Sequence, residues 1–426
     1  MKIKYFVVIL IIFQLSCGSA AKKLQTDTMP PVAEIPQKAE IPMVQTEEVQ
    51  PPAPEKAVKV GAERLEVYLP LLKGKTVALL VNHTSTVGKT HLVDTLQRLN
   101  IRIKAIFAPE HGFRGTASDG EKIEDAKDPD TGIPLISLYG SKRAPSAQDL
   151  AGIDWLLFDI QDVGTRFYTY ISTMAYAMQA CADNNVKCMI LDRPNPNGHF
   201  VDGPMLAPEF KSFVGLHPVP VVYGMTIGEY AQMTNGENWL AGNKSCDLTI
   251  ITCENYDHTT IYELPTKPSP NLPNMRAIYL YPSICFFEGT NVSVGRGTNK
   301  QFQVLGAPNY TKGDFTFSPQ PMEGAMQPPL QGQLCRGYDL THLDPQLIRA
   351  EGRINLSYLL DFYANYPNKE AFFLKTNYID KLAGSKKLRD QIIAGKSEAD
   401  IRASWQEELA AFKLVRKKYL LYKDFE

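Results

Sequence analysis

The sequence lacks the short motifs that mark the common nucleotide and serine hydrolase folds. It has no G-x-G-x-x-G segment after its first predicted strand, no G-x-x-x-x-G-K-[ST] segment and no G-x-S-x-G segment. The first two motifs hold phosphates on a glycine-rich backbone, and the third presents a nucleophilic serine on a tight turn. Their absence argues against a nicotinamide or ATP cofactor and against a serine hydrolase.

Metal-binding patterns and an excess of one charge are also missing. The seven histidines form no His-x-x-x-His pair, and the cysteines show no Cys-x-x-Cys spacing, so a zinc site has little support. The net charge of −1 leaves no overall basic field of the kind that nucleic acid selects. We therefore expect a small or uncharged-backbone ligand, no metal and no nucleic acid partner.

The N-terminus reads as a targeting segment. Two lysines precede an apolar run at residues 5–15, which is too short to span a bilayer, for which about 20 residues are needed. Residues 15–18, LSCG, resemble a bacterial lipoprotein processing site with Cys17 as the lipidated residue, although Gln14 departs from the usual aliphatic residue. We expect a signal peptide at 1–17 and a lipid anchor at Cys17; simple secretion is the alternative.

Residues 18–59 carry seven prolines and no aromatic residue. Such a segment cannot bury enough apolar surface to fold, so it is predicted to be a disordered tether. Because no acidic export run follows Cys17, we expect the anchored protein on the periplasmic side of a membrane.

Six further cysteines follow Cys17 along the chain. Cys246 and Cys253 flank a predicted strand at 248–251, which would hold their Cα atoms roughly 20 Å apart, beyond disulfide reach. Thiols buried in the core are one interpretation of the six, and other disulfides stay open because an exported protein meets oxidising conditions.

The body of the chain alternates strands with helices. Helical patterns at 91–99 and 170–181 separate apolar runs of strand length. The predicted strands are residues 75–81, 103–108, 155–160 and 188–191. This alternation predicts an α/β fold with a parallel sheet covered by helices on both faces. A proline-rich connection follows at 266–273, and the end of the chain has the apolar spacing of an amphipathic closing helix at 397–422.

Polar residues follow each predicted strand. Since the carboxyl ends of parallel strands meet at one edge of a sheet, we expect these loops to converge on a ligand. The candidates there are Asn82, His83, Glu110, His111, Arg114, Asp162, Arg166, Asp192 and Arg193. A second glycine-rich cluster with a carboxylate and a guanidinium lies in the C-terminal half and contains Glu288, Asn291 and Arg296.

Several of these loops together resemble a known family. The segments are 109–115 (PEHGFRG), 159–164 (DIQDVG) with 166–170 (RFYTY), 191–196 (LDRPNP), and 287–291 (FEGTN) with 295–298 (GRGT). In this order they resemble the exo-β-N-acetylmuramidases of the NamZ family, over residues 60 to the C-terminus. The resemblance implies a Rossmann-like catalytic domain at 60–265, a smaller α+β C-terminal domain at 266–426 and a cleft between them. It also implies release of terminal N-acetylmuramic acid from the non-reducing end of peptidoglycan fragments, without a metal or organic cofactor.

Glycoside cleavage needs a proton donor for the leaving oxygen and a nucleophile at the sugar carbon. The resemblance places the family's catalytic glutamate at Glu110, and neighbouring His111 and Arg114 are suited to tune its proton affinity. The structural alternative is that Glu110 caps a helix or pairs with Arg114. Glu288, Asp162 and Asp192 compete as the second group, and the acetamide of the sugar is a further alternative, so retention and inversion both stay open.

Muramic acid carries a lactyl ether that ends in a carboxylate, which a guanidinium binds well. Arg166, Arg193 and Arg296 are the candidates, and an internal salt bridge is the alternative for each. Asn82, His83 and Asn291 are candidates for the sugar hydroxyls or the acetamide. Aromatic residues beside the loops are more typical of a core than of a sugar platform: Phe167, Tyr168, Tyr170, Phe286 and Phe287.

Two other functions fit the sequence. One is a lipid-anchored peptidoglycan-binding protein that keeps the cleft but has lost catalysis. The other is a different hydrolase on a Rossmann-like sheet, such as an esterase or a deacetylase, although a deacetylase normally requires a metal cluster.

Overall fold

The computed structural model describes residues 56–110, 112–113, 126–140 and 142–426. The predicted signal peptide, Cys17 and most of the predicted tether lie outside these residues. The last tether residue, Lys59, forms an antiparallel bridge with Glu254, and the backbone N–H of each donates to the carbonyl of the other. Over the described ranges, the structure contains no helix that is both long and apolar enough to cross a membrane.

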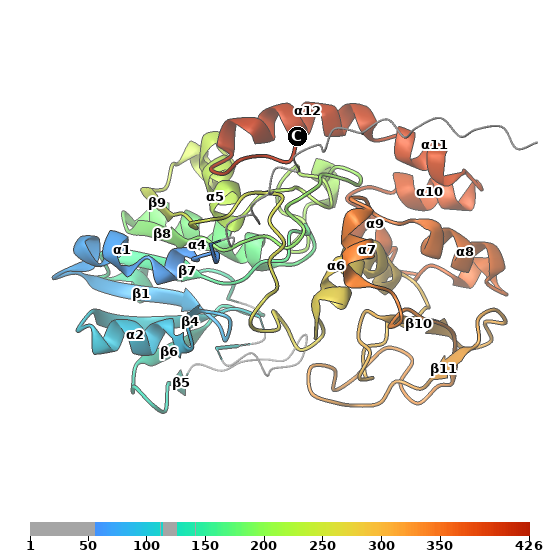
Figure 1. Ribbon diagram of the computed structural model, residues 1–426, viewed down its shortest axis with the longest axis horizontal. Coiled ribbons are helices and arrows are strands. Elements are labelled where there is room, and N and C mark those ends of the chain that lie inside the picture. The colour runs from blue at the N-terminus through green and yellow to red at the C-terminus, as the bar shows by residue number, and fades with distance from the viewer. Residues whose placement is uncertain (1–55, 111, 114–125, 141) are drawn as a thin grey trace, which may run out of the picture. The chain divides into compact units, whose positions relative to one another are not determined.

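A seven-stranded sheet forms the first half of the described chain, with strand order β5-β6-β4-β1-β7-β8-β9 (Figure 1). Its strands are β1 Thr76–Val81, β4 Arg102–Ala108, β5 Ala126–Lys127, β6 Pro134–Ser137, β7 Trp155–Asp159, β8 Lys187–Leu191 and β9 Leu248–Ile251. All neighbouring pairs are parallel except β5 with β6. The predicted parallel α/β sheet is therefore confirmed, with β5 as an antiparallel edge strand.

Helices cover both faces of this sheet because its central strands are apolar on both sides. Along β1, Leu80 packs into one hydrophobic cluster and Leu79 into the other, as expected where successive side chains alternate between faces. The cluster with Leu79 also contains residues of α1 Leu65–Leu72 and α2 Leu92–Arg98. The cluster with Leu80 includes residues of α4 Tyr170–Asn184 and α5 Ile227–Gly236.

The second half of the described chain has a smaller sheet and more helices than the first half. No helix or strand occurs in the described connection 252–274, after which α6 Met275–Ile284 and the 3₁₀ turn η4 Cys285–Gly289 begin the C-terminal part. Its antiparallel sheet has the order β10-β12-β11, with β10 Val304–Ala307, β11 Phe315–Phe317 and β12 Cys335–Asp339. The helices are α7 Pro345–Ala350, α8 Ser357–Asn365, α9 Tyr378–Ala383, α10 Lys387–Ile393, α11 Glu398–Ala403 and α12 Gln406–Arg416. The expected smaller α+β domain is confirmed.

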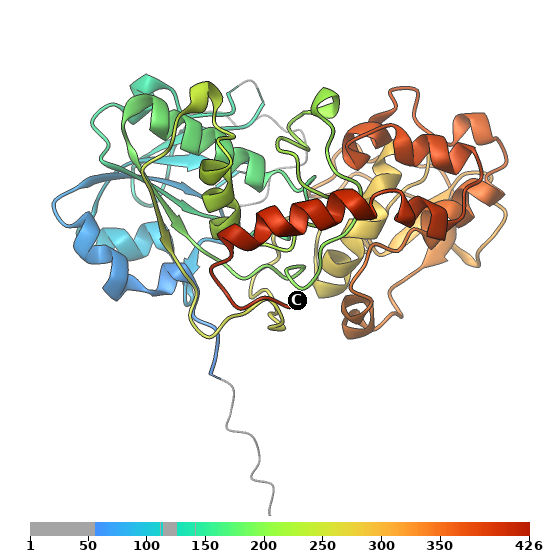
Figure 2. The ribbon, with the colours of Figure 1, turned by 90° about the horizontal axis from the view of Figure 1, so that it is seen from above.

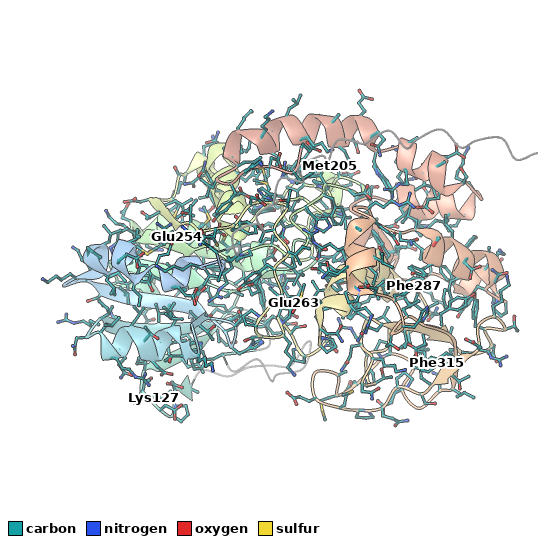
Figure 3. The ribbon with its side chains drawn as sticks, in the orientation of Figure 1. Lys127, Met205, Glu254, Glu263, Phe287 and Phe315 are labelled. Carbon is teal, nitrogen blue, oxygen red and sulfur yellow. The ribbon has the colours of Figure 1, made fainter. Side chains whose placement is uncertain are left out.

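Short elements complete the described chain. They are the hairpin β2 Thr86–Val87 and β3 Thr90–His91, the helix α3 Ala147–Leu150, and the 3₁₀ turns η1 Gly61–Glu63, η2 Pro208–Phe210, η3 Ala241–Asn243, η5 Lys369–Ala371 and η6 Lys417–Tyr419. Figure 3 shows the side chains of both halves, with Lys127 on the β5 edge of the large sheet and Phe315 on the small sheet.

The prediction of one closing helix over 397–422 is wrong. The segment forms α11, α12 and η6, and the chain breaks between α11 and α12 because Trp405 leaves helical geometry at φ −119° and ψ 1° to bury its ring. From there α12 runs back to the large-sheet half (Figure 2). Its last residue, Arg416, donates to the carbonyl of Gly224 and pairs with Asp424 at 2.7 Å, so the C-terminus is fastened to the first half.

Leu79→Ala should lower the free energy of unfolding by about 2–5 kcal/mol, because Leu79 is fully buried between β1 and its covering helices and the change leaves a cavity. Urea unfolding measures the difference. Leu414→Ala is the control, since Leu414 on α12 is 72% exposed and should change stability by less than about 0.5 kcal/mol. Equal losses in the two variants would contradict the assigned core.

Candidate active site

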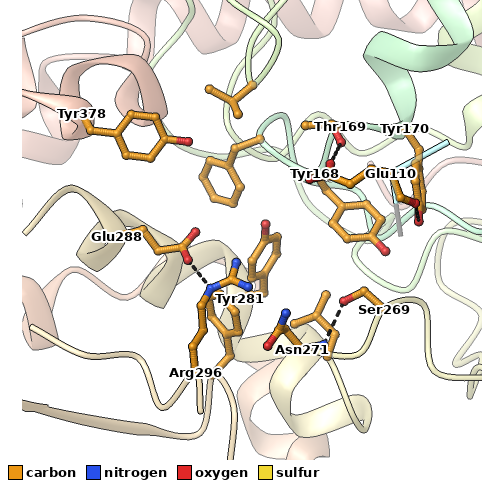
Figure 4. Close-up of a pocket in the computed structure, with 14 residues that line it drawn as sticks. Glu110, Tyr168, Thr169, Tyr170, Ser269, Asn271, Tyr281, Glu288, Arg296 and Tyr378 are labelled. Carbon is orange, nitrogen blue, oxygen red and sulfur yellow. Dashed lines mark hydrogen bonds and ion pairs between the residues drawn. The ribbon is translucent and has the colours of Figure 1, made fainter. Parts of the chain in front are cut away.

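Residues from both halves of the described chain line one cavity, which has an empty volume of about 580 Å³ (Figure 4). It is lined by Glu110, Phe167, Tyr168, Thr169, Tyr170, Val214, Ser269, Asn271, Leu272, Tyr281, Glu288, Arg296, Phe302 and Tyr378. Loops that follow β4 and β7 supply one wall, and the η4 turn with the glycine-rich segment after it supplies the wall opposite. A cavity lined by two carboxylates, a guanidinium and several aromatic rings suits a small polar ligand.

Glu110 stands two residues beyond β4, at the point where the chain turns away from the sheet. Gly112 adopts a φ of 75°, which favours glycine, and its N–H closes the turn on the carbonyl of Pro109 at 3.0 Å. The hydroxyl of Thr169 donates to Oε2 of Glu110 at 2.7 Å. Thr169 is the N-cap residue of α4, yet its hydroxyl makes no cap hydrogen bond to the helix; it binds the carboxylate instead.

Tyr170 supports the Glu110 loop from behind. Its hydroxyl donates to the backbone carbonyl of Glu110 at 3.4 Å and accepts from Nδ2 of Asn82 at 3.0 Å. Burial, and after it the charge of Glu110, raises the pKa of Tyr170, so its hydroxyl stays protonated at neutral pH. Asn82 is fully buried, and its Oδ1 accepts from the N–H and the hydroxyl of Thr84. The structure thus places Asn82 beneath the cavity wall.

The opposite wall carries an ion pair. Nε of Arg296 lies 2.5 Å from Oε1 of Glu288, and the guanidinium stacks over the ring of Phe302 at 5.1 Å. The two side chains are only 14% and 21% exposed. Gly295 precedes Arg296 with a φ of 82°, and a Cβ there would come within 2.7 Å of the carbonyl of Lys300, so the turn requires glycine.

Asp162 lies near the cavity without lining it. Its Oδ2 accepts from the N–H of Gly164 and the hydroxyl of Tyr223, and its Oδ1 is buried without a hydrogen-bond partner. Burial raises the pKa of Asp162 to about 6. Burial raises the pKa values of Tyr168 and Tyr170, and the charge of Asp162 adds to this rise at both.

Asp192 and Arg193 are buried beneath the strand ends and do not line the cavity. Asp192 accepts from the hydroxyls of Thr226 and Tyr422, and burial raises its pKa to about 6. Arg193 pairs with Asp159 through two hydrogen bonds of 2.6 and 2.9 Å. Both side chains are therefore engaged inside the sheet half, where Arg193 forms the internal salt bridge that was its alternative.

Arg166 is also buried, and its hydrogen bonds go to backbone carbonyls. It donates to the carbonyls of Pro204, Val219 and Leu382. Burial lowers the pKa of its guanidinium to about 9. Because Leu382 belongs to α9, Arg166 ties the loop after β7 to the C-terminal half.

The remaining candidates fall elsewhere. His111 and Arg114 lie outside the described residues. The ring of His83 bonds the carbonyl of Lys267 at 2.7 Å, and His83 is not among the residues that line the cavity. Asn291 donates to the carbonyl of Ala371 and lines a neighbouring cavity.

Among the aromatic residues, the cavity contains Phe167, Tyr168 and Tyr170, while Phe286 is fully buried in the core and Phe287 lines the neighbouring cavity. Sequence reasoning missed six polar or aromatic lining residues: Thr169, Ser269, Asn271, Tyr281, Phe302 and Tyr378. Thr169 lies inside the segment 166–170, which the sequence analysis had already singled out. The other five carry no local signal, because distant parts of the chain bring them to the cavity.

No cluster suited to a metal ion occurs in the part of the chain that the structure describes. The six cysteines there are buried and free: Cys181, Cys188, Cys246, Cys253, Cys285 and Cys335. Among the described residues, the groups that line the cavity are two carboxylates, a guanidinium, an amide, hydroxyls and aromatic rings.

Fold and cavity together define an α/β protein with a carboxylate at a strand end facing a second carboxylate in a smaller domain, an arrangement suited to acid/base chemistry on a small ligand. Residues 77–276 match the N-terminal domain of exo-β-N-acetylmuramidase NamZ, and residues 279–422 match its C-terminal domain. The chain belongs to this family.

Individual relatives agree with this assignment. Peptidoglycan β-N-acetylmuramidase NamZ of Bacillus subtilis is 39% identical over 373 residues, which is 83% of this chain and 89% of that protein. Two crystal structures of DUF1343 family proteins from Bacteroides fragilis share the fold. One is 48% identical with a TM-score of 0.79 and covers 87% of this chain and all of its own; the other is 29% identical with a TM-score of 0.75 and covers 86% and 99%.

Arg193→Leu should lower the free energy of unfolding by about 3–5 kcal/mol, because it leaves the buried carboxylate of Asp159 unpaired. Thermal or urea unfolding measures the loss. Lys244→Leu is the matched control: it breaks the surface pair with Asp183 and should cost less than about 1 kcal/mol. A stable Arg193→Leu protein would contradict the structural role assigned to Arg193.

Asp162→Asn should change how stability depends on pH. Its pKa is raised from 3.8 to about 6 in the folded state, so the folded protein holds a proton here that the unfolded chain has released. The contribution of Asp162 to the free energy of unfolding therefore falls as the pH rises from about 3.8 to about 6. Urea unfolding measures this: the free energy of unfolding of the asparagine variant should fall less steeply with pH across this range than that of the wild type. An unchanged dependence of that free energy on pH would argue against the raised pKa.

Proposed function

We propose that this protein is an exo-acting glycoside hydrolase that releases terminal β-N-acetylmuramic acid from the non-reducing end of peptidoglycan fragments. Membership of the exo-β-N-acetylmuramidase family supports the substrate class. The observation that carries the proposal is Glu110, held by Thr169 in a cavity whose opposite wall is the Glu288–Arg296 pair.

Glu110 is the general acid. It donates its proton to the glycosidic oxygen while the bond from that oxygen to C1 of the sugar breaks, and the bonding electrons leave with the oxygen. The positive charge that develops at C1 is then met by a nucleophile. In the second step a water attacks C1 while the bond between C1 and the nucleophile breaks and its electrons return to the nucleophile; the water gives its proton to the Glu110 carboxylate, which restores the acid.

Two groups compete for the nucleophile. The carboxylate of Glu288 faces the same cavity, and the acetamide of the sugar is the alternative. The hydrogen bond from Arg296 fixes the direction of the Glu288 carboxylate. Asp162 and Asp192 are buried away from the cavity lining, so in this proposal they shape the site without touching the sugar.

Binding of the sugar falls to the remaining lining residues. The rings of Phe167, Tyr281 and Phe302 pack against one another inside the cavity and offer apolar surface to a sugar face. Arg296 is positioned to contact the lactyl group. His111 and Arg114 stay predicted partners of Glu110.

We also propose the domain limits and location that the sequence predicts. The signal peptide is 1–17, the tether 18–59, the catalytic domain 60–265 and the cleft-completing domain 266–426. Lipid on Cys17 holds the protein at the periplasmic side of a membrane. Membrane fractionation of the wild type and of Cys17→Ser tests this, and equal release of both proteins into the soluble fraction would contradict the anchor.

Glu110→Gln should lower the release of p-nitrophenol from p-nitrophenyl β-N-acetylmuramide by about 10²-fold or more, because the amide cannot donate the proton. The melting temperature should stay close to that of the wild type. Glu209→Gln, a change at an exposed carboxylate outside the cavity, is the control and should keep its activity. If the wild type cleaves neither this muramide nor the matching glucosaminide, the muramidase proposal fails.

Thr169→Val should move the pH profile of kcat/KM. Its hydroxyl donates to the Glu110 carboxylate and stabilises the charged form, so its loss raises the pKa of the acid and shifts the alkaline limb upward by about 0.4–1 pH unit. Thr169→Ser keeps the hydroxyl and should restore the wild-type profile. A profile that is the same in all three proteins would contradict this role of Thr169.

A further inference from the structure

Asn271 lines the active-site cavity and carries a buried acceptor that is not satisfied. The residue is 3% exposed, and its Oδ1 has no hydrogen-bond partner among the described residues. Burying a carbonyl oxygen without a hydrogen bond costs free energy, so such an atom in a native protein calls for an explanation. Figure 4 shows the side chain directed from its loop toward Tyr281 and Arg296, which line the same cavity. This placement indicates that a ligand completes the hydrogen bond.

The fold fixes the direction of this side chain. Nδ2 of Asn271 donates to the carbonyl of Gly324 at 2.9 Å. The segment around Gly324 packs closely on the loop, because a Cβ on Gly324 would lie 2.4 Å from Cβ of Pro270. The hydroxyl of Tyr168 donates to the carbonyl of Pro268 at 2.9 Å, which joins the loop to the cavity wall. Oδ1 is therefore held in place before a ligand binds, which reduces the entropy lost on binding.

The other strong acceptors of the cavity already have a role in the proposed reaction. Among the described lining residues, the acceptors without a hydroxyl group are the carboxyl groups of Glu110 and Glu288 and the amide carbonyl of Asn271. The proposed mechanism assigns Glu110 to the glycosidic oxygen and offers Glu288 as a nucleophile at C1. Asn271 is thus the acceptor that remains for a donor elsewhere on the sugar.

The chemistry of the amide limits what this ligand group can be. Oδ1 only accepts hydrogen bonds, and the donor side of the amide is engaged by Gly324. The ligand must therefore supply an N–H or an O–H. A terminal N-acetylmuramic acid carries such donors on its acetamido nitrogen and on its hydroxyl groups at C4 and C6. Its lactyl carboxylate and its glycosidic oxygen only accept, so neither pairs with Oδ1.

We propose that Asn271 is a substrate-binding residue whose Oδ1 accepts a hydrogen bond from an uncharged donor of the muramic acid, the acetamido N–H or a hydroxyl group. This inference rests on the proposed muramidase function. Asn271 takes no part in breaking the glycosidic bond; it adds affinity for the sugar and fixes its orientation in the cavity.

Asn271→Leu replaces the amide by an apolar group of similar size and should weaken the binding of N-acetylmuramic acid by about threefold to tenfold. Titration calorimetry measures Kd. Asn368→Leu is the matched control, because Asn368 is exposed and lies outside the cavity lining, and it should leave Kd unchanged. The same Kd for the wild type and Asn271→Leu would overturn the proposal alone. A wild type that neither binds N-acetylmuramic acid nor cleaves the muramide would overturn the proposed function as well.

Sugar analogues separate a hydrogen bond to the substrate from a purely structural role of Asn271. One analogue carries an O-acetyl ester in place of the acetamido group, and the other two lack the hydroxyl at C4 or at C6. Asn271→Leu should cost no further affinity for the analogue that lacks the bound donor, while it weakens the other two by about threefold to tenfold. The ester identifies the acetamido N–H as the donor, and a deoxy sugar identifies a hydroxyl. A loss of the same size for all three analogues would overturn the proposal.

If Asn271→Leu fails to fold, a crystal structure of the wild type with bound N-acetylmuramic acid decides instead. An N–H or O–H donor of the sugar should lie within about 3.2 Å of Oδ1. A bound sugar with no donor within this distance would overturn the proposal.

Discussion

The hydrogen bond between Asn82 and Tyr170 connects the loop after β1 with the first turn of α4, and the position of Glu110 depends on both elements. The hydroxyl of Tyr170 also donates to the backbone carbonyl of Glu110, and the hydroxyl of the adjacent Thr169 donates to the Glu110 carboxylate. Three strand-end loops are thereby joined into one wall. Buried polar groups are destabilising without hydrogen-bond partners. In this wall they form hydrogen bonds with one another, which gives the wall a defined geometry.

Below this wall, buried charges satisfy one another. Arg193 is paired with Asp159, and Asp192 collects hydroxyl and backbone donors. These residues resemble binding residues in the sequence because they occupy the same polar loops as Glu110. Their role in the fold is to satisfy the strand ends, since a buried carboxylate or guanidinium without a partner is strongly destabilising.

The opposite wall depends on a different constraint. Glycine at 295 permits the turn that brings Arg296 to Glu288, and α9 packs against the η4 turn that carries Glu288, where Ile379 leaves no room for a Cβ on Gly289. Arg166 then bonds the end of α9 to the loop that leads into Thr169. The two carboxylates of the cavity are thus held by elements that contact each other directly, and the Glu288–Arg296 pair also lines the neighbouring cavity.

The sequence by itself determined the parallel sheet, its coverage by helices on both faces, the smaller C-terminal domain and the family. Continuous apolar runs of strand length and long ordered motifs are local features, so they can be read without knowing the fold. It also singled out Glu110, Glu288 and Arg296, which the structure brings to one cavity.

Only the tertiary structure decided which polar loop residues reach that cavity and which lie beneath it. Asn82, Arg166, Asp192 and Arg193 are indistinguishable from lining residues in the sequence, because burial depends on what packs above a side chain. Tyr378 comes from a segment far along the chain, and no local pattern encodes its contact with the cavity.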